Sequence, residues 1–400
     1  MLSVFNINGL QKSEHNRALC RAHAERHGAL NGALNGGAGD GPSARRRKAA
    51  DPSGMMLEFV IRTTGQAADG IMQALTTGVA VITYNGLKYL PQQLDSIVAQ
   101  TRVPGHIVVS DDNSSDGTWE FLQDWAQRCP VRVTLIRNEP QLGLIGNFEQ
   151  AIGAVEADIV FTADQDDIWL ADKVERLARV FETEPDVLLV HTDATLVDAD
   201  DRDLGTTLLA ELGLTNAERS AIAADRAFEV YCRRNVVTGA TAAFRRSLLQ
   251  VAHPLPRTMY HDTWLAFMAG GIGKVRLLDV PLIRYRQHGG NLVGMKKLGR
   301  IERLRHLWWA MNSNYRLSTE IGHIVDYRVD VHTRLSAQRA APPAHLALAA
   351  EALAFARRRG SLPRNPLLRA GAVLQIMATR RYHRFSNRPW SDSFRDVVNK

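Results

Sequence analysis

The sequence Ile159-Val160-Phe161-Thr162-Ala163 runs directly into Asp164-Gln165-Asp166-Asp167. The apolar run is rich in β-branched and aromatic residues, which is typical of a buried strand. Asp164 and Asp166 are two residues apart, so on an extended segment their side chains point to the same side. Two carboxylates placed in this way can hold Mg²⁺ or Mn²⁺, with phosphate oxygens and water completing the shell. Asp167 is either a further ligand or the cap of a helix that starts near Trp169.

The chain around this stretch alternates short apolar runs with segments of helical periodicity. Such alternation predicts an α/β fold, in which helices flank both faces of a mainly parallel sheet. Ligands of these sheets bind beyond the carboxyl ends of the strands. The expected strands are 79–84, 106–110, 131–136, 159–162, 186–191, 236–244, 275–278 and 282–285. Helices are expected at 87–98, 116–128, 147–155 and 170–181 and after Asp262, with loop and helix over 194–234 and mostly helix over 296–400.

Polar residues follow the expected strands 79–84 and 106–110, as they follow the strand 159–162. Tyr84 and Asn85 end the first strand, and Asp111 and Asp112 end the second. In the functional interpretation, one of these two carboxylates accepts a hydrogen bond from the ring N–H of a pyrimidine base. Asp112 is favoured for this role. The alternative is a strand-to-helix turn whose polar groups satisfy one another. The coincidence of three polar strand ends at one edge of the sheet favours a ligand site there.

Two later residues are candidates for chemistry. Asp262 stands at the start of an expected helix, where it is either an N-cap or a general base beside a metal–diphosphate. His261 either assists Asp262 or merely precedes it. His288 follows a strand and precedes two glycines. It either completes the metal coordination once a nucleotide binds or has a purely structural role.

Charge is distributed unevenly along the 400 residues. The net charge of +7 divides into +4 over residues 1–54, −10 over 55–295 and +13 over 296–400. Residues 1–54 are rich in Gly, Ala, Asn and Arg and cannot bury a core, so a disordered extension is expected. We therefore predict three parts, which are a poorly ordered extension (1–75), an α/β domain (76–295) and a basic, mostly helical region (296–400).

The location of the protein follows from what the sequence lacks. Three cysteines lie far apart, which indicates a reducing compartment without a disulfide framework. No secretory signal and no apolar run of about 18 residues are found, so a cytoplasmic protein without a membrane-spanning helix is expected. Residues 298–311 alternate apolar and basic side chains near helical spacing. The basic C-terminal region (296–400) is therefore expected either to contact the cytoplasmic face of the inner membrane peripherally or to pack a helix on the catalytic domain.

Taken in order, five segments resemble the family 2 glycosyltransferases and are most similar to bacterial rhamnosyltransferases of surface polysaccharide assembly. These segments are 79–85, 111–118, 164–169, 261–264 and 285–291. The resemblance covers roughly residues 78–295. It implies a GT-A-type (Rossmann-like) domain, a nucleotide-sugar donor and inversion at the anomeric carbon.

The resemblance also implies roles for individual residues. Asp262 matches the catalytic base, and Asp166 and His288 match metal ligands. Asn235, Gly239, His261 and Asp167 match residues around the acceptor and the donor sugar. The nucleotide-binding set is Thr83, Tyr84, Asn85, Asp111, Asp112 and Asp164.

The predicted function is metal-dependent transfer of a sugar to a hydroxyl of a glycan or polyprenyl-diphosphate-linked acceptor. The donor is dTDP-L-rhamnose or a UDP-hexose. The Gln-x-x-Arg-Trp motif of processive synthases is absent from the sequence, which favours a non-processive enzyme. A sugar-nucleotide nucleotidyltransferase is an alternative, but residues 83–87 supply no Gly-rich, basic phosphate loop. A non-catalytic sugar-nucleotide or nucleic-acid binding module is another, although the acidic body argues against a nucleic-acid partner.

Overall fold

The computed structural model describes residues 74–288 and 317–398. The predicted disordered extension, the amphipathic segment 298–311 and the boundary predicted between residues 295 and 296 lie outside these described residues. The described residues form part of one compact unit. None of the described helices is long and apolar enough to cross a bilayer.

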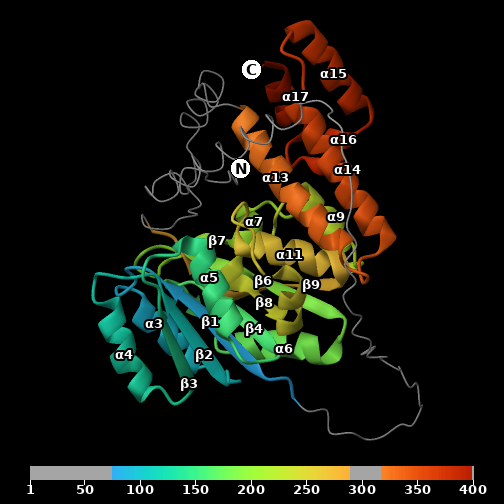
Figure 1. Ribbon diagram of the computed structural model, residues 1–400. Coiled ribbons are helices and arrows are strands. Elements are labelled where there is room, and N and C mark those ends of the chain that lie inside the picture. The colour runs from blue at the N-terminus through green and yellow to red at the C-terminus, as the bar shows by residue number, and fades with distance from the viewer. Residues whose placement is uncertain (1–73, 289–316, 399–400) are drawn as a thin grey trace, which may run out of the picture. The chain divides into compact units, whose positions relative to one another are not determined.

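A nine-stranded sheet organises the described residues, in the order β3-β2-β1-β4-β8-β6-β9-β5, with β7 paired to β6 (Figure 1). The four strands β1 to β4 are mutually parallel. β8 then enters antiparallel to β4, so the sheet is mixed. The strands are β1 (Thr77–Thr83), β2 (His106–Asp111), β3 (Arg132–Arg137), β4 (Ile159–Ala163), β5 (Ile168–Trp169), β6 (Val187–Val197), β7 (Asp203–Thr207), β8 (Ala242–Arg245) and β9 (Lys274–Arg286).

Alternation along the buried strands divides the core between the two faces of the sheet. Ala80 and Ile82 of β1 join one hydrophobic cluster, whereas Val79 and Val81 join the other. The first cluster is covered by α5 (Gly143–Ala154), α9 (Ala227–Arg233) and α11 (His261–Ile272). The second is covered by α3 (Leu90–Val98), α4 (Thr118–Arg128) and α6 (Lys173–Thr183). The predicted α/β class with helices on both faces is confirmed.

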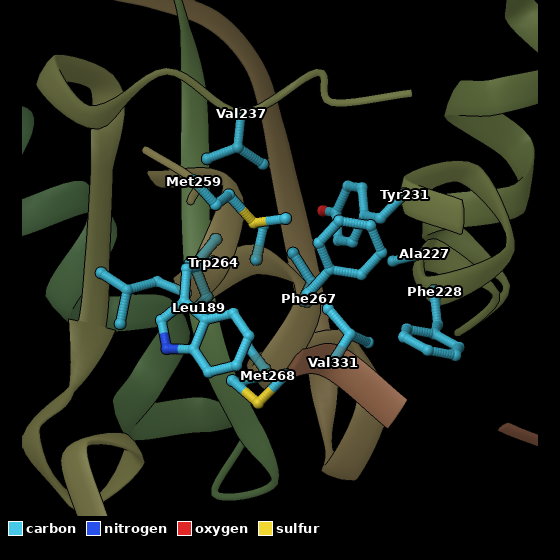
Figure 2. Packing of buried hydrophobic residues seen from close by; sticks show 14 of the residues in the cluster. Leu189, Ala227, Phe228, Tyr231, Val237, Met259, Trp264, Phe267, Met268 and Val331 are labelled. Atoms are coloured by element: carbon cyan, nitrogen blue, oxygen red, sulfur yellow. The ribbon is translucent and has the colours of Figure 1, made fainter. Parts of the chain in front are cut away.

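The central helix α11 is buried over almost its whole length. Its Trp264 donates from Nε1 to the carbonyl oxygen of Ala252 at 2.7 Å. Figure 2 shows Trp264, Phe267 and Met268 packed with Tyr231 of α9 and Val331 of the C-terminal region. This packing fixes the helix axis, and with it the residues of the first turn of α11.

The C-terminal region is helical where it is described, as predicted. Arg328 donates to the carbonyl oxygen of Cys232 at 2.7 Å, and Arg334 donates to the carbonyl oxygen of Val251 at 2.8 Å. These bonds join the first C-terminal helix to the α/β domain. The helices are α13 (Leu317–Ser336), α14 (Pro343–Gly360), α15 (Pro366–Ala378), α16 (Arg381–Phe385) and α17 (Pro389–Val398), drawn in orange to red in Figure 1.

The structure corrects four local expectations. Ile168 and Trp169 form a strand with β9, and the following helix begins only at Lys173, so the prediction that Asp167 caps a helix is wrong. The two short strands expected at 275–278 and 282–285 are one strand, β9. The expected strand 236–244 is confined to β8, because residues 239–241 form a 3-10 turn. Residues 194–234 contain the expected helices, α7 (Leu208–Glu211), α8 (Asn216–Ala223) and α9, but the end of β6 and all of β7 were not expected there.

Candidate active site

The ends of β1 and β4 are joined by the side chain of Gln165. Its Oε1 accepts hydrogen bonds from Thr83 Oγ1 at 2.7 Å and from the Tyr84 N–H at 2.8 Å. Its Nε2 donates to the carbonyl oxygen of Tyr84 at 3.2 Å. The residue between the two predicted cation ligands therefore fixes the loop that carries two of the predicted nucleotide-binding residues.

The end of β2 is joined to β1 in the same way. The Asn85 N–H donates to Ser114 Oγ at 2.8 Å, and Asn85 Oδ1 accepts from the Ser115 N–H at 2.9 Å. Asp111 is fully buried and accepts from the Ser114 N–H at 2.9 Å. Thr83, Asn85 and Asp111 therefore lie at one edge of the sheet, as expected for parallel strands in register.

Asp112 has a structural role in addition to the role predicted for it. Its Oδ1 accepts from the Leu142 N–H at 2.7 Å, and its Oδ2 accepts from the Gly143 N–H at 2.9 Å. A carboxylate at this place satisfies donors that the first turn of α5 leaves unpaired. Any contact between Asp112 and a base must use the remaining acceptor capacity of the two oxygens.

Four carboxyl groups share a desolvated region beyond β4. The pKa of Asp164 is raised to about 7, chiefly by burial, with the nearby carboxylates of Asp166 and Asp262 contributing to the rise. Burial also raises the pKa of Asp167 well above its usual range, with Asp166 and Asp164 adding to the effect. Because like charges in a dry site oppose each other's ionisation, this region favours the binding of a cation.

Asp166 and His288 form the pair best suited to a divalent cation. His288 Nε2 lies 2.8 Å from Asp166 Oδ2, and the imidazole stacks on Tyr89 with 4.8 Å between ring centroids. Burial raises the pKa of Asp166, and the hydrogen bond with His288 opposes that rise. In residues 74–288 and 317–398, no group of three or more His, Cys, Asp or Glu side chains is arranged to coordinate a metal ion by itself. A carboxylate and an imidazole fit Mg²⁺ or Mn²⁺ whose other ligands are phosphate oxygens and water.

Asp262 lies in the first turn of α11, after the N-cap Tyr260, so it is not the N-cap. Its Oδ1 accepts from the Thr263 N–H at 2.5 Å, and its Oδ2 accepts from the Gly239 N–H at 3.3 Å. Burial raises the pKa of Asp262 to about 6, although these backbone bonds oppose the rise. A partly buried carboxyl group with a pKa near neutrality is suited to general-base chemistry.

His261 is packed against the turn that holds Asp262. Its imidazole stacks on Phe148 with 3.5 Å between ring centroids, and burial lowers its pKa to about 3. A Cβ atom added to Gly239 would come within 2.4 Å of His261 Nε2. Glycine at position 239 therefore permits the close approach of the turn to this neutral imidazole. Asn235, in contrast, bonds at both ends of its amide to Val237 in its own loop.

Lys173 is a residue of the site that the sequence analysis missed. It is fully buried, donates from Nζ to the carbonyl oxygen of Ala240 at 2.7 Å, and lies 3.6 Å above the Trp169 ring. Burial lowers the pKa of its ammonium group, whereas the nearby carboxylates of Asp167 and Asp164 raise it. Lys173 thus joins the acidic cluster to the turn of residues 239–241, whose first N–H contacts Asp262. The lysine stands nine residues after Asp164, and only the position of α6 reveals that it points inward.

Two residues of β9 also belong to the site without having been assigned a role. Tyr285 is nearly buried, and burial raises the pKa of its phenol well above the usual range, with Asp167 and Asp164 adding to the effect. Arg286 donates to the carbonyl oxygen of Asp166 at 2.9 Å and lies 4.8 Å from the centre of the Tyr89 ring. Both residues belong to segment 285–291, one of the five segments that carry the family resemblance. The alternation of the strand alone did not indicate which of the two side chains faces the carboxylates.

Comparison with known proteins identifies the α/β part of the chain. Residues 78–251 match the model of the family described as glycosyl transferase family 2. This part of the chain is a family 2 glycosyltransferase domain. The match includes every site residue up to Gly239 and ends before Asp262 and His288.

Two relatives in sequence are named as a glycosyltransferase and a rhamnosyl transferase. An uncharacterized glycosyltransferase of Nostoc sp. is 26% identical over 216 residues, which cover 53% of this chain and 65% of the relative. The dTDP-rhamnosyl transferase RfbG of Shigella flexneri is 25% identical over 240 residues, which cover 57% of this chain and 80% of the relative. The S. aureus TarS structure with UDP-GlcNAc is 16% identical, covers 81% of this chain and 90% of that chain, and gives a TM-score of 0.45.

The buried lysine gives a first prediction. Replacing Lys173 with methionine leaves the acidic cluster without its cation, so the free energy of unfolding should fall by about 3 kcal/mol at pH 8. The loss should be smaller at pH 5, because Asp164, whose pKa is about 7, is then protonated and needs no partner. Urea denaturation at both pH values measures this difference. Lys274→Met is the control, since Lys274 is partly exposed at the start of β9. An equal loss at the two pH values would show that Lys173 does not balance the carboxylates.

Proposed function

We propose that the protein is an inverting, metal-dependent glycosyltransferase that moves a sugar from a nucleotide-sugar to a hydroxyl of a glycan or lipid-linked acceptor. The observation that carries the proposal is the placement of Asp262. It is a partly buried carboxyl group with a pKa of about 6, close enough to Asp164 to raise the pKa of that residue. A base and a cation-binding cluster in one desolvated region are the two elements that such a transfer needs.

The acceptor hydroxyl is a weak nucleophile, so its proton must leave as the new bond forms. Asp262 takes that proton on a carboxylate oxygen, and its bonds to the N–H groups of Thr263 and Gly239 hold the carboxylate in place. For inversion, the hydroxyl attacks from the side of the sugar opposite the diphosphate. Asp262 therefore serves the acceptor side, and Asp164 and Asp166 serve the nucleotide side.

The nucleoside diphosphate leaves as an anion. Asp166 and His288 would hold Mg²⁺ or Mn²⁺, which supplies positive charge to the departing phosphates. Asp164 is assigned to the ribose, and Thr83, Tyr84, Asn85, Asp111 and Asp112 to the nucleoside. His261, Gly239, Asn235 and Asp167 are assigned to the surroundings of the donor sugar and acceptor. Without a cation, the carboxylates at this edge would repel a diphosphate, so the residues present need one for binding as well as for catalysis.

The donor is proposed from similarity. A relative with 25% identity over 57% of this chain is named a dTDP-rhamnosyl transferase, which supports dTDP-L-rhamnose, with a UDP-hexose as the other candidate. The proposed acceptor is a glycan or a polyprenyl-diphosphate-linked sugar reached from the cytoplasm. The proposed division into 1–75, 76–295 and 296–400 assigns the transfer to the second part.

The role of Asp262 is tested by Asp262→Asn. Without a carboxylate to accept the proton, kcat should fall by about 10²- to 10⁴-fold, while affinity for the nucleotide stays within a few-fold of the wild-type value. The measurement is nucleoside diphosphate release from a panel of dTDP- and UDP-sugars, together with nucleotide titration. Asp124→Asn, on the exposed face of α4, is the control. Activity within tenfold of wild type would remove Asp262 as the base.

The value of kcat/KM should also fall as the pH is lowered. Asp262 acts only as a carboxylate, and its pKa is about 6, so kcat/KM should fall about tenfold for each pH unit below 6. Above that pH the carboxylate is fully formed, and the profile should level off. A pH–rate profile from pH 4.5 to 8 measures this. A flat acidic limb would mean that no group with this pKa limits the reaction.

The cation ligands make a separate prediction. Asp166→Asn and His288→Ala each remove one of the few protein ligands, so Mn²⁺ affinity with bound nucleoside diphosphate should weaken at least about tenfold. Titration followed by electron paramagnetic resonance reads binding without turnover. His253→Ala is the matched control, because His253 is about half exposed at the end of a different helix. Unchanged affinity in both variants would assign the cation to other residues.

A further inference from the structure

The corner between α14 and α15 combines exposed leucines with exposed arginines. Leu367 is 84% exposed and Leu368 is 66% exposed, both in the first turn of α15. Arg357 and Arg358 lie in the last turn of α14, and Arg364 lies in the short connection between the helices. We call these five residues the α14–α15 corner. Single exposed leucines are ordinary, but two adjacent ones beside three cations form a defined surface.

The arginines of the corner differ from most other arginines of the C-terminal helices. Arg359, directly after Arg358, is buried and bonds through Nε and Nη2 to Asp396 at 2.6 and 2.8 Å. Arg357, Arg358 and Arg364 are exposed and form no ion pair with any residue in 74–288 or 317–398. Residues 317–398 hold thirteen arginines and six acidic residues, so the excess positive charge is available at the surface.

A depression borders the corner on α14. It has a volume of about 550 Å³, and its lining includes Arg357 and Arg358 beside His332 and Leu353. Cationic groups next to apolar carbon atoms match an anionic headgroup joined to acyl chains. The neighbouring helix α17 packs against α15 and exposes Trp390 and Phe394, which are four residues apart on one helical face (Figure 1). Tryptophan is favoured at the boundary between lipid and water.

We propose that the α14–α15 corner docks the protein on the surface of an anionic lipid bilayer. Leu367 and Leu368 enter the boundary between headgroups and acyl chains, and Arg357, Arg358 and Arg364 contact the lipid phosphates. Charge complementarity selects this occupant, because each basic side chain near an anionic leaflet adds attraction. A surface in which leucines stand beside unpaired arginines is poorly suited to a second copy, whose own corner carries the same positive charge.

This docking is independent of the proposed sugar transfer. It requires no donor, acceptor or cation, and its residues are distinct from all those assigned to the active site. It narrows the membrane contact predicted for the basic C-terminal region (296–400) to five described residues, whereas residues 298–311 lie outside the described part of the chain. Its consequence for a transferase would be to hold the enzyme where acceptors carried on lipid are found.

The test is flotation of the full-length protein with vesicles of phosphatidylglycerol and phosphatidylcholine, compared with vesicles of phosphatidylcholine alone. Wild type should float with the anionic vesicles. Leu367→Ser/Leu368→Ser removes two inserting side chains and should lower the partition coefficient about tenfold or more. Arg357→Gln/Arg358→Gln/Arg364→Gln should lower it about fivefold for each arginine. Leu204→Ser, on β7 and likewise exposed, is the control and should float as wild type does.

Three results would overturn the proposal. Failure of wild type to float on anionic vesicles would mean that no bilayer docks here. Wild-type flotation of the double serine variant would assign membrane binding to another segment, such as 298–311. A dimer of the wild-type protein that the serine pair dissociates, measured by light scattering without vesicles, would assign the corner to a second copy. Thermal unfolding of each variant in solution checks that the helices remain folded.

Discussion

The gathering of four carboxyl groups in one desolvated region, with Lys173 next to Asp164 and Asp167, is the constraint on which the site depends. Asp164, Asp167 and Asp262 all have raised pKa values because water has been removed from them. One ammonium group cannot balance four carboxylates. The cluster therefore remains partly protonated, or it recruits a further cation, and a cation recruited there has phosphate oxygens as its natural additional ligands.

The pairing of the strands brings the site residues together. Parallel pairing of β1 with β2 and β4 brings their carboxyl ends to one edge, and Gln165 joins two of those ends directly. The antiparallel β8 then leads back from the turn that contacts Asp262. Lys173 bonds to the same turn from α6. The 239–241 turn thus donates to Asp262 and accepts from Lys173, so a displacement of this turn would disturb both residues.

The sequence predicted the parts of the fold whose signals are local. The strands β1 to β4 follow from short β-branched runs, and the helices α3, α4 and α5 follow from apolar spacing. The strand formed by Ile168 and Trp169 was missed because two apolar residues carry no measurable periodicity, and only their pairing with β9 makes them a strand. The 3-10 turn before β8 has the same apolar composition as a strand, so composition could not separate them.

The outline of the candidate site was predicted from the order and position of its motifs, not from local periodicity. Carboxylates after strands are informative because topology brings strand ends together, and the order of the motifs added the family resemblance. The inward direction of Lys173 and Tyr285 depends on where α6 and β9 pack, which is a long-range property. A lysine is rarely buried without a partner, so an isolated lysine in a helix start is ordinarily taken as exposed. Three partners of Lys173 show that this expectation does not hold here. Asp164 and Asp167 lie close to Lys173 in sequence, whereas Ala240 is distant.

The division of charge along the chain follows from the same electrostatics. The α/β domain is acidic, and its carboxylates would oppose an anionic donor unless positive charge neutralises them locally. The C-terminal helices have the opposite balance and pair only some of their arginines internally, as Arg359 does with Asp396. An acidic domain favours the binding of a cation, and a basic region favours the binding of an anionic surface. Reversing the sign of charge in either part would remove its own preference. The separation of the acidic and basic parts therefore lets one chain carry the proposed cation site and, apart from it, the proposed docking surface.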